Sequence, residues 1–304
     1  MDQAHDKHRT ALVGAAIAVV VWGSSGIAAR KIDLPPSGIA LYRFAVFGLA
    51  LVAWMALRRT PMTRRALLAS LPGGLCLAAD VYFYFYAVKH TSITNATLIG
   101  SLQPLLIMAV SVPMYGERPS RRDVGAALVA LTGVAAVVVI GSGQPTWSGL
   151  GDLAAAGATV SWGGYFIASR HAQERLTSVE FTTGTSLWTA VLNVPIALVT
   201  GQSLAAPRAD DWPLLVFVAF GVGLFGSALM NWAIPHLPLW LSSVMTLIIP
   251  IVAAFLAWWI LDERLTIAQV AAMGVVLGAL AVIVVGQAAP SPPDSEPAEV
   301  TGAG

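Results

Sequence analysis

Two opposite charges inside long apolar runs are the residues best suited to chemistry in this chain of 304 residues. Arg43 lies in one such run, and Asp80 lies in the next. At 1.5 Å of rise per helical residue, they would lie about 9 Å and about 12 Å from the same ends of neighbouring helices. Because an unpaired charge at that depth is costly, we expect either an ion pair or a site for a proton or a charged solute.

Aromatic residues form a second candidate set. Five follow Asp80 in a row, from Tyr82 to Tyr86, and Trp-Gly pairs recur 140 positions apart at Trp22 and Trp162. Such rings could form an interfacial belt or lie beside closely packed helices, or they could wall a pocket for a ring-bearing solute. The predicted aromatic wall comprises Trp22, Tyr82, Tyr86, Trp162, Tyr165 and Trp232.

Uncharged polar residues accompany two prolines in the middle of apolar runs, Pro104 and Pro250. Proline removes a backbone hydrogen bond and bends a helix, so both are predicted as helix kinks, in moving helices or in packing alone. Amides and hydroxyls can bind a zwitterion without the burial of a fixed charge. The predicted polar residues of a substrate site are Ser24, Asp80, Asn95, Ser101, Gln103 and Asn231.

Enzymatic motifs are missing from the sequence. It contains no HExxH, no Ser-His-Asp arrangement and no nucleotide-binding loop, and His90 and His236 are isolated at predicted helix ends. Cys76 is the single cysteine, which excludes a disulfide framework and a CxxC metal site. We therefore predict that the protein is not an enzyme and has no catalytic residues, metal, cofactor or nucleic-acid partner.

A lipid bilayer must surround these residues, because 57% of the chain is hydrophobic and only 11% is charged. Soluble domains average about 25% charged residues. Apolar runs of about 17–25 residues are typical of spanning helices, and these do not alternate in polarity as barrel strands would. The sequence predicts an all-α integral membrane protein with ten transmembrane helices, at roughly 11–29, 37–57, 66–88, 93–114, 123–141, 149–169, 180–200, 212–232, 239–261 and 267–287.

A duplication with an offset of 146 positions divides the chain. Five helices in each half make the second half inverted relative to the first. The predicted divisions are a cytoplasmic lead at 1–10, the first repeat at 11–141, the inverted repeat at 142–287 and a disordered cytoplasmic tail at 288–304. The matched residues are Ala87, His90, Pro104, Glu117 and Arg118 in one copy, and Ala233, His236, Pro250, Glu263 and Arg264 in the other.

Positive charges predict that both termini are cytoplasmic. With the N-terminus inside, inner segments hold eleven Lys and Arg residues and outer segments hold five. The inner set is Lys7, Arg9, Arg58, Arg59, Arg64, Arg65, Arg118, Arg121, Arg122, Arg170 and Arg175, and the outer set is Arg30, Lys31, Lys89, Arg208 and Arg264.

Inverted repeats that each contain a bent, polar helix are typical of an alternating-access transporter. A membrane-embedded enzyme or a structural protein is the alternative class. A further motif, Gly274-x-x-x-Gly278, is typical of close helix packing, either on another helix of the chain or on a second copy, which leaves a homodimer open.

The sequence resembles the drug/metabolite transporter superfamily, in particular its EamA-type ten-helix members, over about residues 10–287. Asp262 departs from the family pattern, which usually has glycine there. The residues that carry the resemblance are Trp22-Gly23-Ser24, Ala87, Pro104, Gly116-Glu117-Arg118, Gly125, Gly133, Pro250, Glu263-Arg264 and Gly274.

The resemblance implies a basket of two inverted repeats around a central cavity lined by the first, third, fourth, sixth, eighth and ninth helices. It implies a secondary transporter of the bacterial inner membrane whose partners are a small-molecule substrate and membrane lipid. Export of amino acids, including aromatic or neutral ones, fits the aromatic residues; export of drugs or other metabolites is the alternative.

Overall fold

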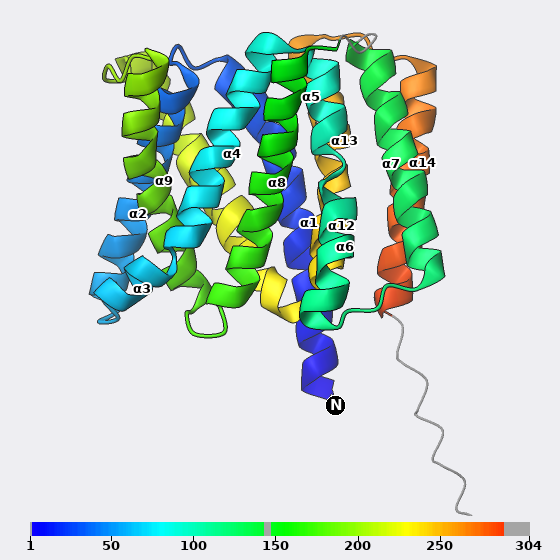
Figure 1. The fold of residues 1–304 in the computed structure, drawn as a ribbon, viewed down its shortest axis with the longest axis horizontal. Helices are drawn as coiled ribbons and strands as arrows, with labels where there is room; N and C mark the ends of the chain where they lie inside the picture. Colours follow the sequence, from blue (N-terminus) through cyan, green and yellow to red (C-terminus); the bar gives the residue numbers. More distant parts are fainter. Residues whose placement is uncertain (1, 143–146, 289–304) are drawn as a thin grey trace, which may run out of the picture.

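The computed structural model describes residues 2–142 and 147–288, which form a bundle of helices without strands in these ranges (Figure 1). Eight of its helical stretches are long and apolar enough to cross a membrane. The helices α1 (Asp2–Arg30) and α8 (Gly149–Ala172) also run the height of the bundle (Figure 1). The tail predicted at 288–304 lies, except for its first residue, outside the described residues.

Six of the predicted spans are each formed by a single continuous helix. Every one of the ten predicted apolar runs falls on helical structure, with ends within a few residues except at α1. There the structure differs from the prediction, because α1 begins at Asp2 and includes the expected lead. The continuous helices are α1, α2 (Pro36–Leu57), α7 (Arg121–Ser142), α8, α9 (Ser178–Thr200) and α14 (Ile267–Ala288).

The other stretches are segmented. Their segments are α3 (Arg64–Ala69) and α4 (Leu71–His90); α5 (Ile93–Gly100) and α6 (Gln103–Tyr115); η1 (Ala209–Asp211), α10 (Trp212–Val216), the π-helical η2 (Phe217–Ala228), α11 (Leu229–Ala233) and η3 (Ile234–His236); and α12 (Leu239–Val244), the 3₁₀ turn η4 (Met245–Ile248) and α13 (Ile249–Leu261).

Local sequence accounts for several helix ends. Pro36 occupies the first position of α2, where its missing N–H costs nothing. Thr177 and Glu180 form a capping box at the start of α9, in which the Thr177 hydroxyl accepts from the Glu180 N–H at 3.2 Å. Gly201 ends that helix with a φ of 65°, a left-handed conformation that glycine adopts without a steric cost.

Helices from the two halves pack in matching pairs. The first half contributes α4 against α8, and the second contributes η2 against α1. In addition, α2 packs on α9 and α7 packs on α14. Glycines allow close approach: a Cβ on Gly74 would lie 2.3 Å from the Trp188 side chain of α9, and one on Gly133 would lie 2.6 Å from Val276 of α14.

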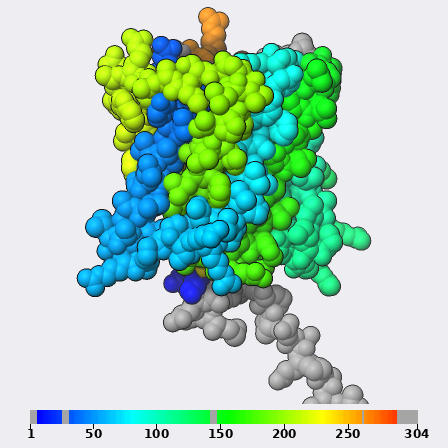
Figure 2. Space-filling model, turned by 60° about the vertical axis from the view of Figure 1, so that its left-hand side comes forward, coloured from blue at the N-terminus to red at the C-terminus, as the bar shows by residue number. Residues whose placement is uncertain are grey.

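The outer surface is apolar. Figure 2 shows α9 filling the surface between α2 and α4. Large hydrophobic side chains such as Leu57 and Val199 are exposed there. On α14, a Cβ added at Gly274 or Gly278 would meet nothing within 4 Å, so this motif does not pack closely on another helix of the described chain. Packing on a second copy stays a prediction.

Candidate functional site

Aromatic rings from both halves meet inside the bundle. Trp22 of α1 and Trp162 of α8 contact each other edge to face, with ring centroids 5.1 Å apart. Trp162 lies parallel to Tyr165 one turn along α8, at 5.5 Å, and Tyr165 lies 5.8 Å from Phe181 of α9. Trp22 and Tyr165 are 8% and 2% exposed. The two Trp-Gly sites that recur in the sequence are therefore neighbours in space.

Asn231 of α11 holds a polar network beside these rings. Its side-chain amide donates to the Tyr165 hydroxyl at 2.7 Å and to the Thr182 hydroxyl at 3.0 Å. Its side-chain oxygen accepts from the hydroxyls of Tyr165 and Ser169, each at 3.0 Å. Both amide hydrogens and both oxygen lone pairs are thus in use. Asn231 is a predicted substrate-site residue, and in this structure its hydrogen-bonding groups are occupied by protein partners.

A second polar contact lies at the break between α5 and α6. The Ser243 hydroxyl of α12 donates to the side-chain oxygen of Gln103 at 2.7 Å, and both residues are buried. The Gln103 amide nitrogen Nε2 is also buried and has no hydrogen-bond partner. Leaving such a donor unsatisfied costs about 1–3 kcal/mol. This donor is therefore suited to a ligand that brings an acceptor.

Both predicted kinks coincide with helix interruptions. Ser101 and Leu102 separate α5 from α6, and Pro104 lies in the first turn of α6. The turn η4 separates α12 from α13, and Pro250 lies in the first turn of α13. The Ser101 hydroxyl donates to the Thr97 carbonyl at 2.8 Å, so it serves its own helix. The interruptions place Gln103 and Ser243 opposite each other.

Several predicted site residues lie apart from the aromatic centre. Tyr82 lies 6.2 Å from Tyr86, whose ring stacks on His90 at 4.0 Å near the end of α4. Trp232 lies 5.1 Å from His236, also four residues along the chain, with the two rings tilted by 35°. No ring contact in the described residues joins these pairs to Trp22 or Trp162. The predicted wall thus divides into a central group and two groups at helix ends.

Two further polar predictions have local partners. The Asn95 amide donates to Asp152 at the start of α8, at 2.8 Å, and the Thr91 hydroxyl donates to the same carboxylate at 2.7 Å. The Ser24 hydroxyl donates to the Val21 carbonyl of its own helix at 2.7 Å. In this structure these side chains stabilise the helices and their connections.

Of the two alternatives expected for Arg43 and Asp80, the ion pair is not formed in the described residues. The ion pairs formed by the described residues involve other groups, and neither side chain has an oppositely charged partner within 4.0 Å. The Arg43 guanidinium instead lies 4.8 Å from the centre of the Phe44 ring. Both charged residues are half-buried. The interior therefore contains a cation and a carboxyl group that do not pair with each other.

Glu117 of the first half and Arg170 of the second half hold the turn before α12, at the end of the bundle where α1 begins, and sequence reasoning missed this role of Arg170. The Glu117 carboxylate accepts from the backbone N–H groups of Leu239 and Trp240, at 2.7 and 3.2 Å. Arg170 donates to the carbonyls of Ile234 and Leu237, at 2.6 and 3.1 Å. These contacts hold both sides of the turn before α12.

The polar residues on one face of α8, of which only Tyr165 was predicted, share a sequence signal. Tyr165, Ser169 and Gln173 recur every four residues, which places them on one face of a helix. In the structure the Gln173 amide donates to the Ser169 hydroxyl at 2.8 Å and extends the Asn231 network. A row of polar residues on an otherwise apolar helix predicts a buried network.

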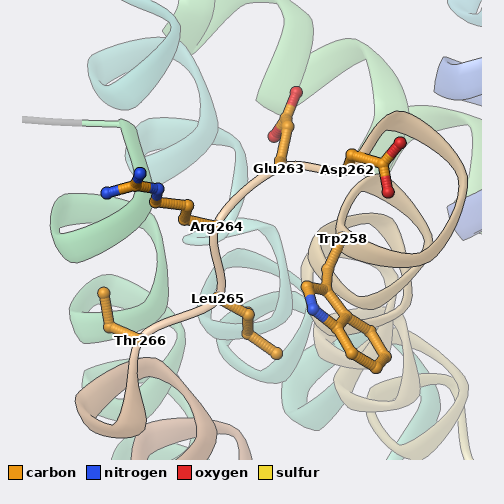
Figure 3. Close-up of a pocket in the computed structure, with 6 residues that line it drawn as sticks. All are labelled: Trp258, Asp262, Glu263, Arg264, Leu265 and Thr266. Carbon is orange, nitrogen blue, oxygen red and sulfur yellow. The ribbon is translucent and has the colours of Figure 1, made fainter.

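The hollows found on the described chain lie away from the aromatic centre. One, of about 430 Å³, lies at the turn from α13 to α14, where Trp258 and the side chains of 262–266 surround it (Figure 3). The other, of about 490 Å³, is an apolar groove between α2 and α9. Neither contains a predicted site residue. The described residues also contain no cluster of three potential metal ligands.

An apolar helical bundle with buried polar residues at interrupted helices defines a membrane transporter rather than an enzyme. The family model described as "EamA-like transporter family" matches residues 9–139 and 149–285. The chain therefore belongs to the EamA-like transporter family, which confirms the resemblance found in the sequence. The double match also places one family unit in each half of the chain.

Two relatives have printed names that mention amino acids. An "Aromatic amino acid exporter YddG" of Ancylobacter novellus is 34% identical over 158 residues, 50% of this chain and 53% of the relative. A "Probable terminal-alkyne amino-acid exporter" of Streptantibioticus cattleyicolor is 34% identical over 97 residues, 31% of this chain and 32% of the relative. The chain thus matches about half and about a third of these relatives.

A solved structure titled only "Crystal structure of protein" shares the fold. It superposes with a TM-score of 0.76 at 23% identity, covering 90% of this chain and 97% of that chain. The arrangement of helices is therefore one that a solved protein also adopts.

Proposed function

We propose that the protein is a secondary exporter of amino acids, aromatic or neutral ones above all, that works by alternating access. The observation that carries the proposal is the contact of Trp22 with Trp162 beside the Tyr165–Asn231 hydrogen bonds. Stacked rings with hydroxyl and amide groups suit a solute with an aromatic side chain and a polar head. The printed names of the two amino-acid exporters support the same substrate class.

The proposed architecture is ten transmembrane helices in two inverted five-helix repeats around a central substrate path. The offset of 146 residues and the family match in each half support it. Packing supports it too: exchanging the halves converts the α4–α8 pair into the η2–α1 pair and leaves the α2–α9 and α7–α14 pairs in place. Rocking of one repeat against the other would then expose the path to each side in turn.

The proposed substrate site comprises the central rings with Gln103 and Asp80. Asp80 is half-buried without an ion pair, so its carboxylate suits the ammonium group of an amino acid. Tyr82, Tyr86 and Trp232 would contact the substrate nearer the helix ends as it enters or leaves. Pro104 and Pro250 would let the broken helices bend during the exchange.

Both termini are proposed to be cytoplasmic. The distribution of Lys and Arg supports this, and α1 begins at the same end of the bundle as α14 ends (Figure 1). Single cysteines at Lys7 and Lys31, in a chain with Cys76 replaced by serine, test it. A membrane-impermeant thiol reagent should label Lys31→Cys but not Lys7→Cys in intact cells; the reverse labelling would invert the topology.

Transport by the purified protein in liposomes tests the function. A panel of radiolabelled amino acids should be moved without any other protein, with aromatic and neutral ones preferred over acidic and basic ones. Transport of drugs or other metabolites but no amino acid would favour the alternative substrate class. No transport of any solute would favour a membrane protein with another role.

Alanine at Trp162 tests the aromatic site. Losing a ring contact costs about 0.5–1.5 kcal/mol beyond lost area, so the half-saturating concentration should rise severalfold with little change in expression. Trp259 is 68% exposed on the outer surface, which makes Trp259→Ala a matched control without this effect. Normal concentration dependence in the Trp22, Trp162 and Trp232 alanine variants would show that the indoles only pack.

A further inference from the structure

Arg43 belongs to the inner face of α2. Ala40 and Phe47 lie three and four residues from it and are both buried, whereas Leu49 on the opposite side is 61% exposed. The Arg43 guanidinium lies 4.8 Å from the centre of the ring of Phe44, which is itself buried. The charge therefore lies toward the interior of the bundle rather than toward lipid.

The guanidinium has no protein group that neutralises it. None of the ion pairs or hydrogen bonds of the described residues includes it, and its one recorded contact is the Phe44 ring, a neutral group one position along the helix. Charged residues inside membrane helices are otherwise paired or serve a solute. Since Asp80 does not supply the pairing, the partner that Arg43 lacks must come from elsewhere.

A second unsatisfied group, at the start of α6, is also a donor. The Gln103 side chain lies 3.9 Å from where a Cβ on Gly163 would be, next to Trp162, and its amide nitrogen is buried without an acceptor. The Asn231 network at Tyr165 is saturated and offers neither donor an acceptor. The interior thus holds two unused donors, one of them charged, which call for an anionic acceptor.

We propose that Arg43 binds the carboxylate of the transported solute. A guanidinium presents parallel N–H donors that match the two oxygens of a carboxylate, which a lysine ammonium cannot do. The inference rests on the proposed function and deepens it: the exporter requires a free carboxylate, and Gln103 supplies a further hydrogen bond to the same polar head.

Transport of tryptophan and of tryptamine, which lacks the carboxylate, tests the proposal in liposomes. Arg43→Gln should raise the half-saturating concentration for tryptophan about 30-fold, or roughly 2 kcal/mol at 1.4 kcal/mol per tenfold. Any tryptamine transport should change little. Arg43→Lys retains the charge but loses the paired donors, so it should fold and show a smaller loss. Arg58→Gln, at the exposed end of α2 beside Trp54, is the control and should transport as the parent does.

Unchanged tryptophan transport by Arg43→Gln would overturn the proposal and leave the amino-acid exporter standing. Equal losses for tryptophan and tryptamine in both Arg43 variants would also overturn it, because Arg43 would then serve folding or gating. If the parent protein transports other carboxylates but no amino acid, and Arg43→Gln loses that transport, the amino-acid exporter function is refuted. The proposed role of Arg43 in binding a carboxylate is then supported. A parent protein that moves amines but no carboxylate would refute the proposal outright.

Discussion

The turn from α6 to α7 and the turn from α13 to α14 are copies of each other with different surroundings. Glu117 in the first is half-buried and accepts two backbone N–H groups at the start of α12. Glu263, its counterpart, is exposed beside the hollow shown in Figure 3. Arg170 reinforces the first end through the carbonyls before α12.

This difference shows that both halves contain the same turn but that the turn does not have the same structural role in each half. Pro238 precedes α12 and offers no side-chain cap, so the carboxylate of Glu117 satisfies N–H groups that would otherwise lack partners. Negative charge at that position also complements the helix dipole. The two halves are thereby joined at the end where α1 begins, while the turn after α13 lines an open hollow. Substitutions at matched positions can break or sharpen this contrast.

Glu117→Ala should have the largest effect. Hydrogen bonds to charged groups contribute about 1.5–3 kcal/mol, and this variant loses two acceptors at once, so the free energy of unfolding should fall by about that range. Glu263→Ala removes an exposed carboxylate and should cost less. Thermal unfolding of both variants in one detergent measures the difference. Equal losses would show that the two turns are equivalent in strength.

Arg170→Lys should have the next largest effect. A lysine ammonium cannot reproduce the guanidinium geometry that reaches the Ile234 and Leu237 carbonyls. We expect a loss of about 1–2 kcal/mol in unfolding free energy, within the range for charged hydrogen bonds. Arg175→Lys, at an exposed position in the following loop, is the control and should change stability by less than about 0.5 kcal/mol. Similar behaviour of the two variants would remove Arg170 from the connection.

Helix positions followed closely from the sequence, because apolar runs and punctuating prolines fix where a helix can lie. Pro36 lies at the start of α2 and Gly201 directly after the end of α9, positions where proline and glycine are common at helix ends. The division of an apolar run into helical segments could not be predicted from the sequence. Nothing in residues 217–228 distinguishes the π-helical η2 from an ordinary helix, because hydropathy reflects burial and not the register of the backbone hydrogen bonds.

The sequence predicted how deep each site residue lies along its helix, but not the direction in which its side chain points. Counting residues gave Arg43 and Asp80 matched depths, but the rotation of each helix about its axis decides which side chains meet, and that depends on packing with other helices. The meeting of Trp22 with Trp162 could be anticipated only from the repeat. Asn231 meets Tyr165, Ser169 and Thr182 only in the folded chain, because they are distant from it in the sequence. Of these partners, only the two residues of α8 follow a pattern that the sequence shows.

Pro104→Ala should slow transport more than Pro250→Ala. Alanine at 104 restores an N–H that can donate to the Gly100 carbonyl, which favours joining α5 to α6 across Ser101 and Leu102. At 250 the restored N–H must compete, because the Thr246 carbonyl already accepts from Ile249. We expect the initial rate to fall about fivefold for Pro104→Ala, roughly 1 kcal/mol, with a smaller change for Pro250→Ala. Parent rates in both variants would mean that the kinks serve packing alone.

The smallest expected effect concerns the backbone of the two turns. Gly116 and Asp262 occupy the same left-handed conformation, with φ of 65° and 54°. The sequence left this turn in question because Asp262 stands where the family usually has glycine, and the structure shows that aspartate adopts the glycine conformation. An L-residue pays about 1–2 kcal/mol there, less for aspartate, whose short polar side chain can bond locally.

Exchanging the two residue types tests whether backbone strain alone separates the turns. Asp262→Gly should raise the free energy of unfolding by up to about 0.5 kcal/mol, because relief of the strain is partly offset by the greater freedom of glycine in the unfolded chain. Gly116→Asp should lower it by about 1 kcal/mol, since it adds the strain and sets a second carboxylate next to Glu117. Gly116→Ala separates the two contributions, because it adds the strain without the charge. If Gly116→Ala costs as much as Gly116→Asp, the charge contributes nothing and conformation alone governs this position; if Asp262→Gly destabilises the protein, the Asp262 side chain holds the turn through contacts that outweigh its strain.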